Sequence, residues 1–200
     1  MFAILNDATR LMKLVFPRNN GPQARLLINE LIAEEHLSSD FTFTLQVLSD
    51  NAEIALKDVQ GKMVCVELLR DDRSTRYFNG YCFEFSLQKI ANGTAVYQMI
   101  LKPWLALLRL RTDFYIFHNQ TLAEQTKEIF LDYGTASYEI KIRDGDHKRT
   151  FTVQYEESDY NFLHRHWEEH GLHYWYEHTA SGHRLMLSDY SMAAEPIDGN

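Results

Sequence analysis

The stretch VQYEESDYNFLHRHWEEHGLHYWYEH, residues 153 to 178, contains signals for a strand, a helix and a second strand in succession. Ser158 is of a residue type favoured at helix N-caps, and Asp159 in the first turn suits the positive end of the helix dipole. Glycine is common directly after the end of a helix, so Gly171 predicts the helix C-terminus. The alternation in LHYWYEH after it is typical of a half-buried strand. The stretch therefore predicts a β-α-β unit.

The same stretch contains His166-Trp-Glu-Glu169-His170, which has the H-x-x-E-H spacing of inverted zinc-peptidase motifs. Two histidines four residues apart share a helix face, and Glu169 could act as general base toward a metal-bound water. A catalytic zinc also needs a third protein ligand. Glu177 is poorly placed to supply it, because its strand begins directly after the helix. We therefore predict no catalytic, cofactor-binding or metal-ligating residue in the chain, and keep adventitious metal binding and a zinc-dependent hydrolase as alternatives.

The rest of the second half also predicts mixed α and β structure. TLAEQTKEIFLDYG is typical of a helix, with a capping box from Thr121 to Glu124 and Gly134 at its end. Two strands are expected on either side of the turn DGDHK, over residues 137–143 and 149–156, and a last one in HRLMLSD. The order α-β-β-α-β-β predicts an α+β domain over residues 104–200.

The first hundred residues predict short antiparallel strands. FTFTLQVL (41–48) alternates apolar and polar residues, and 63–69, 76–87 and 95–101 are further apolar runs. Asn92-Gly93 indicates a tight hairpin, Asn20-Gly21 another turn, and Gly80 a bulge or bend within a strand. This pattern predicts a small antiparallel β-barrel over residues 1–103, so the chain is mainly β with an α+β domain.

Composition limits the classes of partner. The net charge is −8 with histidines neutral, which disfavours nucleic acid and anionic membranes because both bind basic surfaces. The N-terminus has no basic region before its short apolar run, so we expect synthesis in the cytoplasm without a signal peptide. Cys65 and Cys82 lie in apolar runs and are expected to be buried thiols, with a disulfide possible only if their strands pair closely.

Two stretches resemble the VgrG family, the spike proteins of type VI secretion systems. LKPWLALLRLRTDFYIFHNQTL (101–122) resembles its P-W-L-x-L-L-x-L-R-T-D-x-x-I-F-x-N motif, and residues 153–178 resemble its Y-x-E-S-D-x-x-F-x-x-R-x-x-E-x-x-G-x-x-Y-x-x-x-H block. The matching residues include Pro103, Trp104, Leu105, Thr112, Asp113, Ile116, Phe117, Asn119, Tyr155, Glu157, Ser158, Asp159, Phe162, Arg165, Gly171, Tyr174 and His178. The β-rich first hundred residues also resemble the family. His166 and His170 stand where relatives usually carry other residues, so the zinc-like spacing comes from local variation.

The resemblance implies a structural protein and not an enzyme. The N-terminal part of the family is similar to the baseplate hub of contractile phage tails, in which β-barrels with an α+β insertion form a homotrimer that matches a hexameric Hcp-type tube ring. The resemblance also implies that a chain ending at Asn200 covers the first barrel and the insertion, without the second barrel and the β-helical needle. We therefore expect a hub fragment of a VgrG-type spike. The alternative is the hub of a phage tail or tailocin.

The resemblance further implies partners and location. We expect further copies of the chain and the Hcp-type ring as partners, with baseplate proteins and effectors as further candidates, and neither nucleic acid nor membrane. The protein would be cytoplasmic during assembly and then secreted by the type VI apparatus. Trp104 and Leu105 are either an interface anchor or a buried plug that closes the barrel, and no interface residue is assigned.

Overall fold

The computed structural model describes residues 10–143 and 145–191, and the chain divides into two compact units. Of the described residues, unit one comprises 10–35, 40–103 and 178–183, and unit two comprises 36–39, 104–143, 145–177 and 184–191. Within the described residues, no helix is long and apolar enough to span a membrane.

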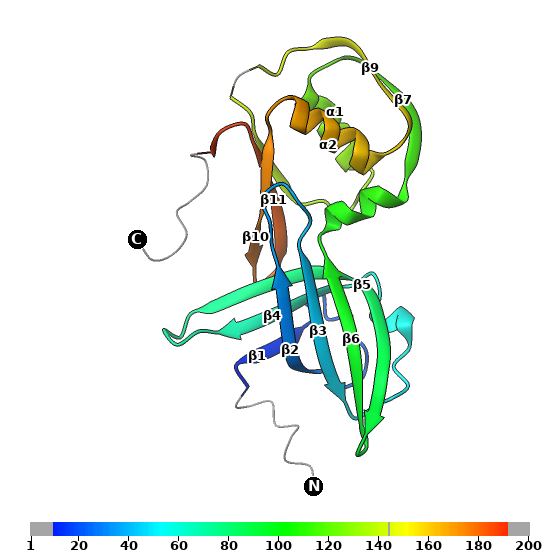
Figure 1. Ribbon diagram of the computed structural model, residues 1–200, viewed down its shortest axis with the longest axis vertical. Helices are drawn as coiled ribbons and strands as arrows, with labels where there is room; N and C mark the ends of the chain where they lie inside the picture. Colours follow the sequence, from blue (N-terminus) through cyan, green and yellow to red (C-terminus); the bar gives the residue numbers. More distant parts are fainter. Residues whose placement is uncertain (1–9, 144, 192–200) are drawn as a thin grey trace. The chain divides into compact units, whose positions relative to one another are not determined.

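Unit one is a curled antiparallel sheet that forms a half-barrel, with the strand order β1-β4-β5-β6-β3-β2 (Figure 1). The strands are β1 (Met12–Val15), β2 (Leu27–Glu34), β3 (Thr42–Ser49), β4 (Met63–Leu69), β5 (Thr75–Ala91) and β6 (Thr94–Lys102). A short 3-10 helix, η3, spans Leu56–Asp58. The alternation predicted for β3 is confirmed, since Phe43, Leu45 and Val47 are fully buried and the residues between them are partly exposed.

The tight hairpin between β5 and β6 is confirmed. Asn92 and Gly93 have φ values of 52° and 76°, the left-handed pair that a type I′ turn requires, and Ala91 pairs with Thr94 on either side. A bulge at Gly80, one of the two predicted roles, is not found, because the register shifts of β5 lie between Cys82 and Glu84 and between Leu87 and Lys89. Gly80 pairs regularly with Val64. A Cβ at position 80 would lie 2.8 Å from the Leu101 Cβ, so the close approach of β6 excludes a side chain there.

Both cysteines are buried free thiols. Their strands β4 and β5 pair, but the residue opposite Cys65 is Asn79, so the register does not bring Cys82 to it. Burial raises the pKa of each thiol to about 12. Neither cysteine is therefore a reactive thiolate at neutral pH.

Unit two contains two helices and short strands from two sheets. Its elements are the 3-10 helix η4 (Trp104–Leu110), β7 (Thr112–Gln120), α1 (Leu122–Leu131), β8 (Tyr138–Lys141), β9 (Arg149–Ser158), α2 (Asp159–Glu169), β10 (His173–Thr179) and β11 (Gly182–Ser188). The last two strands also contribute residues to unit one. The sheets are a two-stranded ribbon, β7-β9, and a three-stranded sheet, β10-β11-β8.

The helix signals of unit two are largely confirmed. Thr121 and Glu124 form the capping box of α1, and the Ser158 side chain accepts a hydrogen bond from the Asn161 backbone as the N-cap of α2. Gly171 follows the C-cap of α2 with φ 69°. Gly134 does not end α1 in this way, because the C-cap is Asp132 and Gly134 lacks a left-handed conformation.

The strand pairing of unit two differs from the predicted arrangement. The strands predicted on either side of the turn DGDHK do not pair with each other, since β8 pairs in parallel with β11 and β9 pairs antiparallel with β7. The strand β7 was not predicted, although it supplies the partner of β9. Pairing with β7 places one face of β9 against the helices, which buries Thr152 and Gln154.

Candidate functional site

The two motifs that resemble the spike family meet in the β7-β9 ribbon. The first motif ends in β7 and the second begins in β9, and Thr112 pairs with Ser158 while Asp113 pairs with Glu157. The Asp159 backbone N–H also donates to the Arg111 carbonyl oxygen, at 3.1 Å. Residues that are distant in the sequence therefore form one site.

A buried carboxylate lies at the centre of this site. Asp159 is fully buried, and one of its oxygens lies 3.0 Å from Arg111 Nε. The same oxygen accepts a hydrogen bond from the Tyr133 hydroxyl at 2.6 Å, and the other accepts from Gln154 Nε2 at 2.8 Å. Burial and the bond to Asp159 raise the pKa of Tyr133 above its usual range. Each partner comes from a different element or loop, so Asp159 joins the ribbon, α2 and the end of α1.

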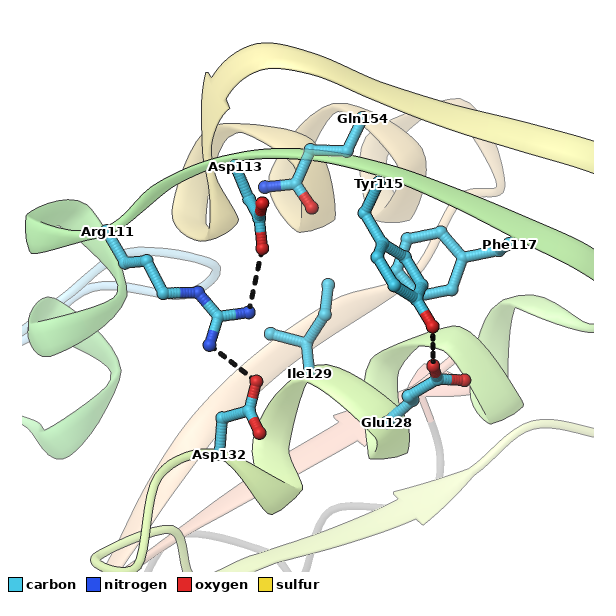
Figure 2. Close-up of a pocket in the computed structure, with 8 residues that line it drawn as sticks. All are labelled: Arg111, Asp113, Tyr115, Phe117, Glu128, Ile129, Asp132 and Gln154. Atoms are coloured by element: carbon cyan, nitrogen blue, oxygen red, sulfur yellow. Dashed lines mark hydrogen bonds and ion pairs between the residues drawn. The ribbon is translucent and has the colours of Figure 1, made fainter.

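A pocket of about 310 Å³ opens beside this carboxylate, between β7 and α1 (Figure 2). Arg111 reaches across it, 3.4 Å from Asp113 and 2.5 Å from Asp132. Burial alone would lower the pKa of Arg111, but the bond to Asp132 and the charge of Asp159 outweigh it and raise that pKa. The lining residues are Arg111, Asp113, Tyr115, Phe117, Glu128, Ile129, Asp132 and Gln154.

The charged side chains of the pocket are all engaged with neighbours. Glu128 accepts from the Tyr115 hydroxyl at 2.7 Å and from Gln120 Nε2 at 2.5 Å, while Arg111 holds Asp113 and Asp132. The bond to Glu128 raises the pKa of Tyr115, so its hydroxyl stays protonated at neutral pH. These groups connect strand β7 to helix α1, which is a structural role. We call this network the clasp; its residues are Arg111, Asp113, Tyr115, Glu128, Asp132, Tyr133, Gln154 and Asp159.

A second ion pair connects β9 to α2. The Arg165 guanidinium contacts both carboxylate oxygens of Glu157, at 3.0 Å and 2.6 Å, and also donates to the Val153 carbonyl oxygen. This fork-like geometry is the strong form of an arginine–carboxylate contact. The hydrogen bond to Glu157 raises the pKa of Arg165.

Trp104 and Leu105 lie in the core of unit two. Both are fully buried, Trp104 Nε1 donates to the Ser137 carbonyl oxygen at 3.1 Å, and its ring packs edge-on against Phe130. Neither predicted role holds, because an interface anchor needs exposure and a barrel plug would belong to unit one.

The zinc-like residues are brought together but engaged by protein groups. His166 is buried, and its Nδ1 lies 3.2 Å from Glu169 Oε2. His170 Nδ1 contacts the His166 carbonyl oxygen, its Nε2 contacts Arg149, and Arg149 also lies 3.5 Å from His166 Nδ1. A guanidinium thus occupies the space between the two imidazoles that a metal ion would need. Burial lowers the pKa of His166.

A third metal ligand is not supplied by the expected residue. Glu177 is exposed on β10, and the described residues contain no group of three metal-binding side chains. The zinc hydrolase alternative is therefore not supported.

Three further histidines, His164, His178 and His183, pack against aromatic side chains. His164 stacks on Tyr160, and its Nε2 lies 2.8 Å from the Tyr174 hydroxyl. In unit one, His178 Nδ1 accepts from the Asn79 backbone N–H at 3.0 Å, and His183 packs against Phe41. Burial lowers the pKa of His164 to about 4 and that of His183 to about 3.

Comparison with known proteins shows the family of the chain. A profile of the phage tail baseplate hub (GPD) family matches residues 34–200. The chain belongs to the phage tail baseplate hub family. The match contains both motifs and all the clasp residues described above.

Relatives of this hub chain include spike proteins. The type VI secretion system spike protein VgrG1b of Pseudomonas aeruginosa is 33% identical over 186 residues, which is 92% of this chain and 25% of that protein. The actin cross-linking toxin VgrG1 of Vibrio cholerae is 32% identical over 80% of this chain and 15% of that protein. The hub chain therefore spans a quarter or less of the length of these relatives.

A solved structure shows the same fold. The E. coli c3393 protein, described as a component of the type VI secretion system with structural similarity to the T4 phage tail proteins gp27 and gp5, matches with a TM-score of 0.81. The match has 20% sequence identity and covers 94% of this chain and 51% of that chain.

Sequence reasoning missed several clasp residues of the hub chain. It identified Asp113, Glu157 and Asp159 by resemblance, and Arg111 stands at the arginine of the L-R-T-D pattern, but no partner was assigned to Arg111, and Tyr133 and Gln154 were not identified. Arg111 directly precedes the matched Thr112-Asp113 and carried a usable signal, because a basic residue beside motif acids suggests an ion pair. Tyr133 carried no such signal, since it lies 26 residues before its partner Asp159 in the sequence. Gln154 lies only five residues before Asp159, but the sequence does not show that both side chains are buried on the same side of the ribbon.

Proposed function

We propose that this chain forms the hub portion of a VgrG-type spike in a type VI secretion system. The observation that carries the proposal is the extent of the likeness, with spike proteins 32–33% identical over nine-tenths of the chain. The fold of the E. coli type VI component supports it. The expected domain division, a first barrel over residues 1–103 and an insertion over 104–200, is part of this proposal.

The proposed role is mechanical and not catalytic. Three copies of the spike would seat on a hexameric Hcp-type ring, and contraction of the sheath would drive both out of the cell, so that secretion needs no signal peptide. The clasp fits this role, because its charged groups are used to connect strands to helices. A network of ion pairs and hydrogen bonds around the buried Asp159 carboxylate gives rigidity to a part that transmits force.

The experiment that tests this function is binding to the tube ring. Purified chain is mixed with a hexameric Hcp-type ring and, in parallel, with a phage tail-tube ring, and each mixture is analysed by size-exclusion chromatography with light scattering. We expect a complex of three chains to one Hcp-type ring and none with the phage ring. A chain that ignores both rings, alone and when part of a longer spike, would contradict the assignment.

A phage tail hub is the second candidate function. The family description itself names phage tail hubs, and the 43 kDa tail protein of prophage MuSo2 from Shewanella oneidensis has a similar fold, with a TM-score of 0.52 and 14% identity over 78% of this chain. Preferential binding to the phage tube ring would support this candidate over the spike.

A further inference from the structure

One edge of the β7-β9 ribbon is open to a further strand. In the part of the chain that the structure describes, β7 and β9 pair only with each other, so each strand has an outer edge. The edge of β9 is occupied where the Arg165 guanidinium donates to the Val153 carbonyl oxygen, at 3.3 Å. The sequence of β7, TDFYIFHNQ, contains neither lysine nor proline, the residues that commonly protect edge strands from pairing. The edge of β7 therefore lacks both kinds of cover.

The strand ladder determines which backbone groups of β7 point outward. The Phe114 N–H donates to Asp113 Oδ1 at 2.7 Å, and the carbonyl oxygen of Val153, opposite Ile116, accepts from a residue outside the ribbon. Pairs in an antiparallel ladder alternate between hydrogen-bonded pairs and pairs whose groups point away, so Ile116 and His118 also turn their N–H and C=O groups outward. Among the described residues, no group outside the ribbon hydrogen-bonds to these two backbones.

A strand added at this edge would meet a hydrophobic surface on its outer side. The outward side chains of the ribbon are large, hydrophobic and between 38% and 70% exposed, namely Phe114, Ile116, Phe151, Val153 and Tyr155. We call these five residues the ribbon face. Phe114 lies opposite Tyr155 with the two rings edge to face at 5.2 Å, and Ile116 lies opposite Val153. The ribbon face is therefore continuous across both strands, and such exposed patches commonly mark interaction sites.

The same added strand would meet the acidic pocket on its inner side. The pocket lies beneath the inward side chains of β7, and Figure 2 shows β7 running between β9 and the α1 residues. The lining carries three carboxylates, from Asp113, Glu128 and Asp132, and a single guanidinium, from Arg111. The side chains of the two aspartates are 39% and 56% exposed. Negative charge therefore exceeds positive charge in the pocket, which favours a cationic side chain.

A buried hydrogen-bond acceptor also points into the pocket. Gln154 is 1% exposed, and its amide nitrogen donates to the Glu157 carbonyl oxygen at 3.1 Å and to Asp159 at 2.8 Å. Its amide oxygen faces the pocket (Figure 2), and among the described residues it has no hydrogen-bond donor. A lysine ammonium has three N–H donors and no acceptor. A lysine side chain in the pocket would therefore satisfy Gln154 and face the carboxylates at the same time.

We propose that the edge of β7 binds an extended segment of another protein in which lysine and aliphatic residues alternate. The segment adds a third strand to the ribbon, with its backbone hydrogen-bonded to Ile116 and His118. Successive side chains of a strand point to opposite faces, so its aliphatic residues lie beside the ribbon face and its lysines face the pocket. The net charge of −8 favours a basic partner over a second copy of this chain. This inference does not rest on the hub assignment.

The first test is titration of the chain with labelled synthetic peptides, followed by fluorescence anisotropy. The probe alternates valine and lysine, VKVKVKVKV, and its control has the same composition in blocks, VVKKVVKKV. We expect the alternating peptide to bind roughly tenfold more tightly than the block peptide, and the glutamate analogue VEVEVEVEV not to bind, because only alternating lysines match both sides of the edge. Equal affinities of the two lysine peptides, or of the lysine and glutamate peptides, overturn the proposal.

The second test locates the peptide site with paired variants. Asp132→Asn removes a pocket charge, and its control Glu168→Gln removes an exposed charge of α2 outside the pocket. Ile116→Lys places a cation on the ribbon face, and its control Leu87→Lys places one on β5 of unit one, where Leu87 is 43% exposed. We expect Asp132→Asn and Ile116→Lys to bind the alternating peptide roughly tenfold more weakly, and the controls to bind it like the wild type. Circular dichroism verifies folding, and an unchanged affinity in either test variant overturns the proposal.

The third test examines strand addition without changing the chain. N-methylation of the valine amides removes the N–H donors from one edge of the alternating peptide, and N-methylation of the lysine amides removes them from the other. We expect one methylated peptide to lose binding and the other to retain it. Retention of binding by both peptides contradicts backbone pairing. A trimer of the chain alone in sedimentation velocity that Ile116→Lys abolishes would assign this edge to a copy of the chain and overturn the proposed partner.

Discussion

The Arg111 guanidinium lies 3.0 Å from the carboxylate of Asp159, and this ion pair connects the end of the first motif to the beginning of α2. Asp159 is fully buried, whereas the Arg111 side chain is 38% exposed. The buried acid is thus neutralised by a cation that reaches in from the pocket. The Tyr133 hydroxyl and the Gln154 amide donate hydrogen bonds to the same carboxylate, so removing the acid takes the acceptor from the Tyr133 hydroxyl and the nearest anion from Arg111 Nε.

We predict that Asp159→Ala lowers the free energy of unfolding by about 3–5 kcal/mol, because breaking a buried charged network leaves its partners unsatisfied. Asp159→Asn retains the shape and loses about 1–3 kcal/mol. Urea denaturation followed by circular dichroism measures both. The control is Asp113→Asn, a partly exposed acid of the same pocket, which should cost less than about 1 kcal/mol. A loss in Asp159→Ala no greater than in this control would contradict the central role of Asp159.

We predict that Gly80→Ala lowers the free energy of unfolding by about 1–3 kcal/mol. The new Cβ would lie 2.8 Å from the Leu101 Cβ and 3.1 Å from the Lys102 carbonyl oxygen, so strand β6 must move. Gly134→Ala is the matched control, since nothing lies within 4 Å of its Cβ position. It should be neutral or slightly stabilising. Urea denaturation measures the free energy of unfolding of both variants. Equal effects would show that strand β6 can move away from position 80 without a loss of stability.

We predict that Thr121→Ala lowers the free energy of unfolding by about 1 kcal/mol, because the Glu124 backbone N–H loses its capping acceptor. Thr121→Ser keeps the hydroxyl and should stay close to the wild type. Hydrogen exchange of the first-turn amides of α1 gives the local measurement. Faster exchange in both variants would assign the effect to the lost methyl group and not to the cap.

We predict that acid destabilises the protein between pH 7 and pH 5. The pKa of His164 is lowered to about 4 and that of His183 to about 3, mainly by burial. The unfolded state takes up protons near pH 6.5 while the folded state does not, so the stability is complete above that value and falls as the pH decreases toward the folded pKa values. Each histidine should cost on the order of 2 kcal/mol at pH 5.

Substitutions test this assignment through the pH dependence. His183→Leu and His164→Gln should each remove part of the difference in unfolding free energy between pH 7 and pH 5, whatever their stability at pH 7. The exposed His118→Gln is the control and should leave the difference unchanged. A difference that persists in full in both core variants would assign the acid sensitivity to other groups.

The helix caps and the tight turn could be predicted from the sequence because each depends on only a few neighbouring residues. The cap at Ser158, the end at Gly171 and the turn at Asn92-Gly93 are each decided by one or two residues and their immediate backbone, and all three are confirmed. The motifs also identified the hub family, since a long pattern of spaced residues carries that information without any knowledge of contacts.

The partners of each strand and the contents of the site were decided only by the tertiary structure. The sequence does not indicate which strand pairs with β9. The turn before β9 suggested β8 as its partner, but in the structure the partner is β7. The same pairing brings Arg111 to Asp159 and places Arg149 between two histidines that share a metal-binding spacing. Spacing along a helix fixes which side chains share a face, but the groups that fill the space in front of that face come from distant parts of the chain.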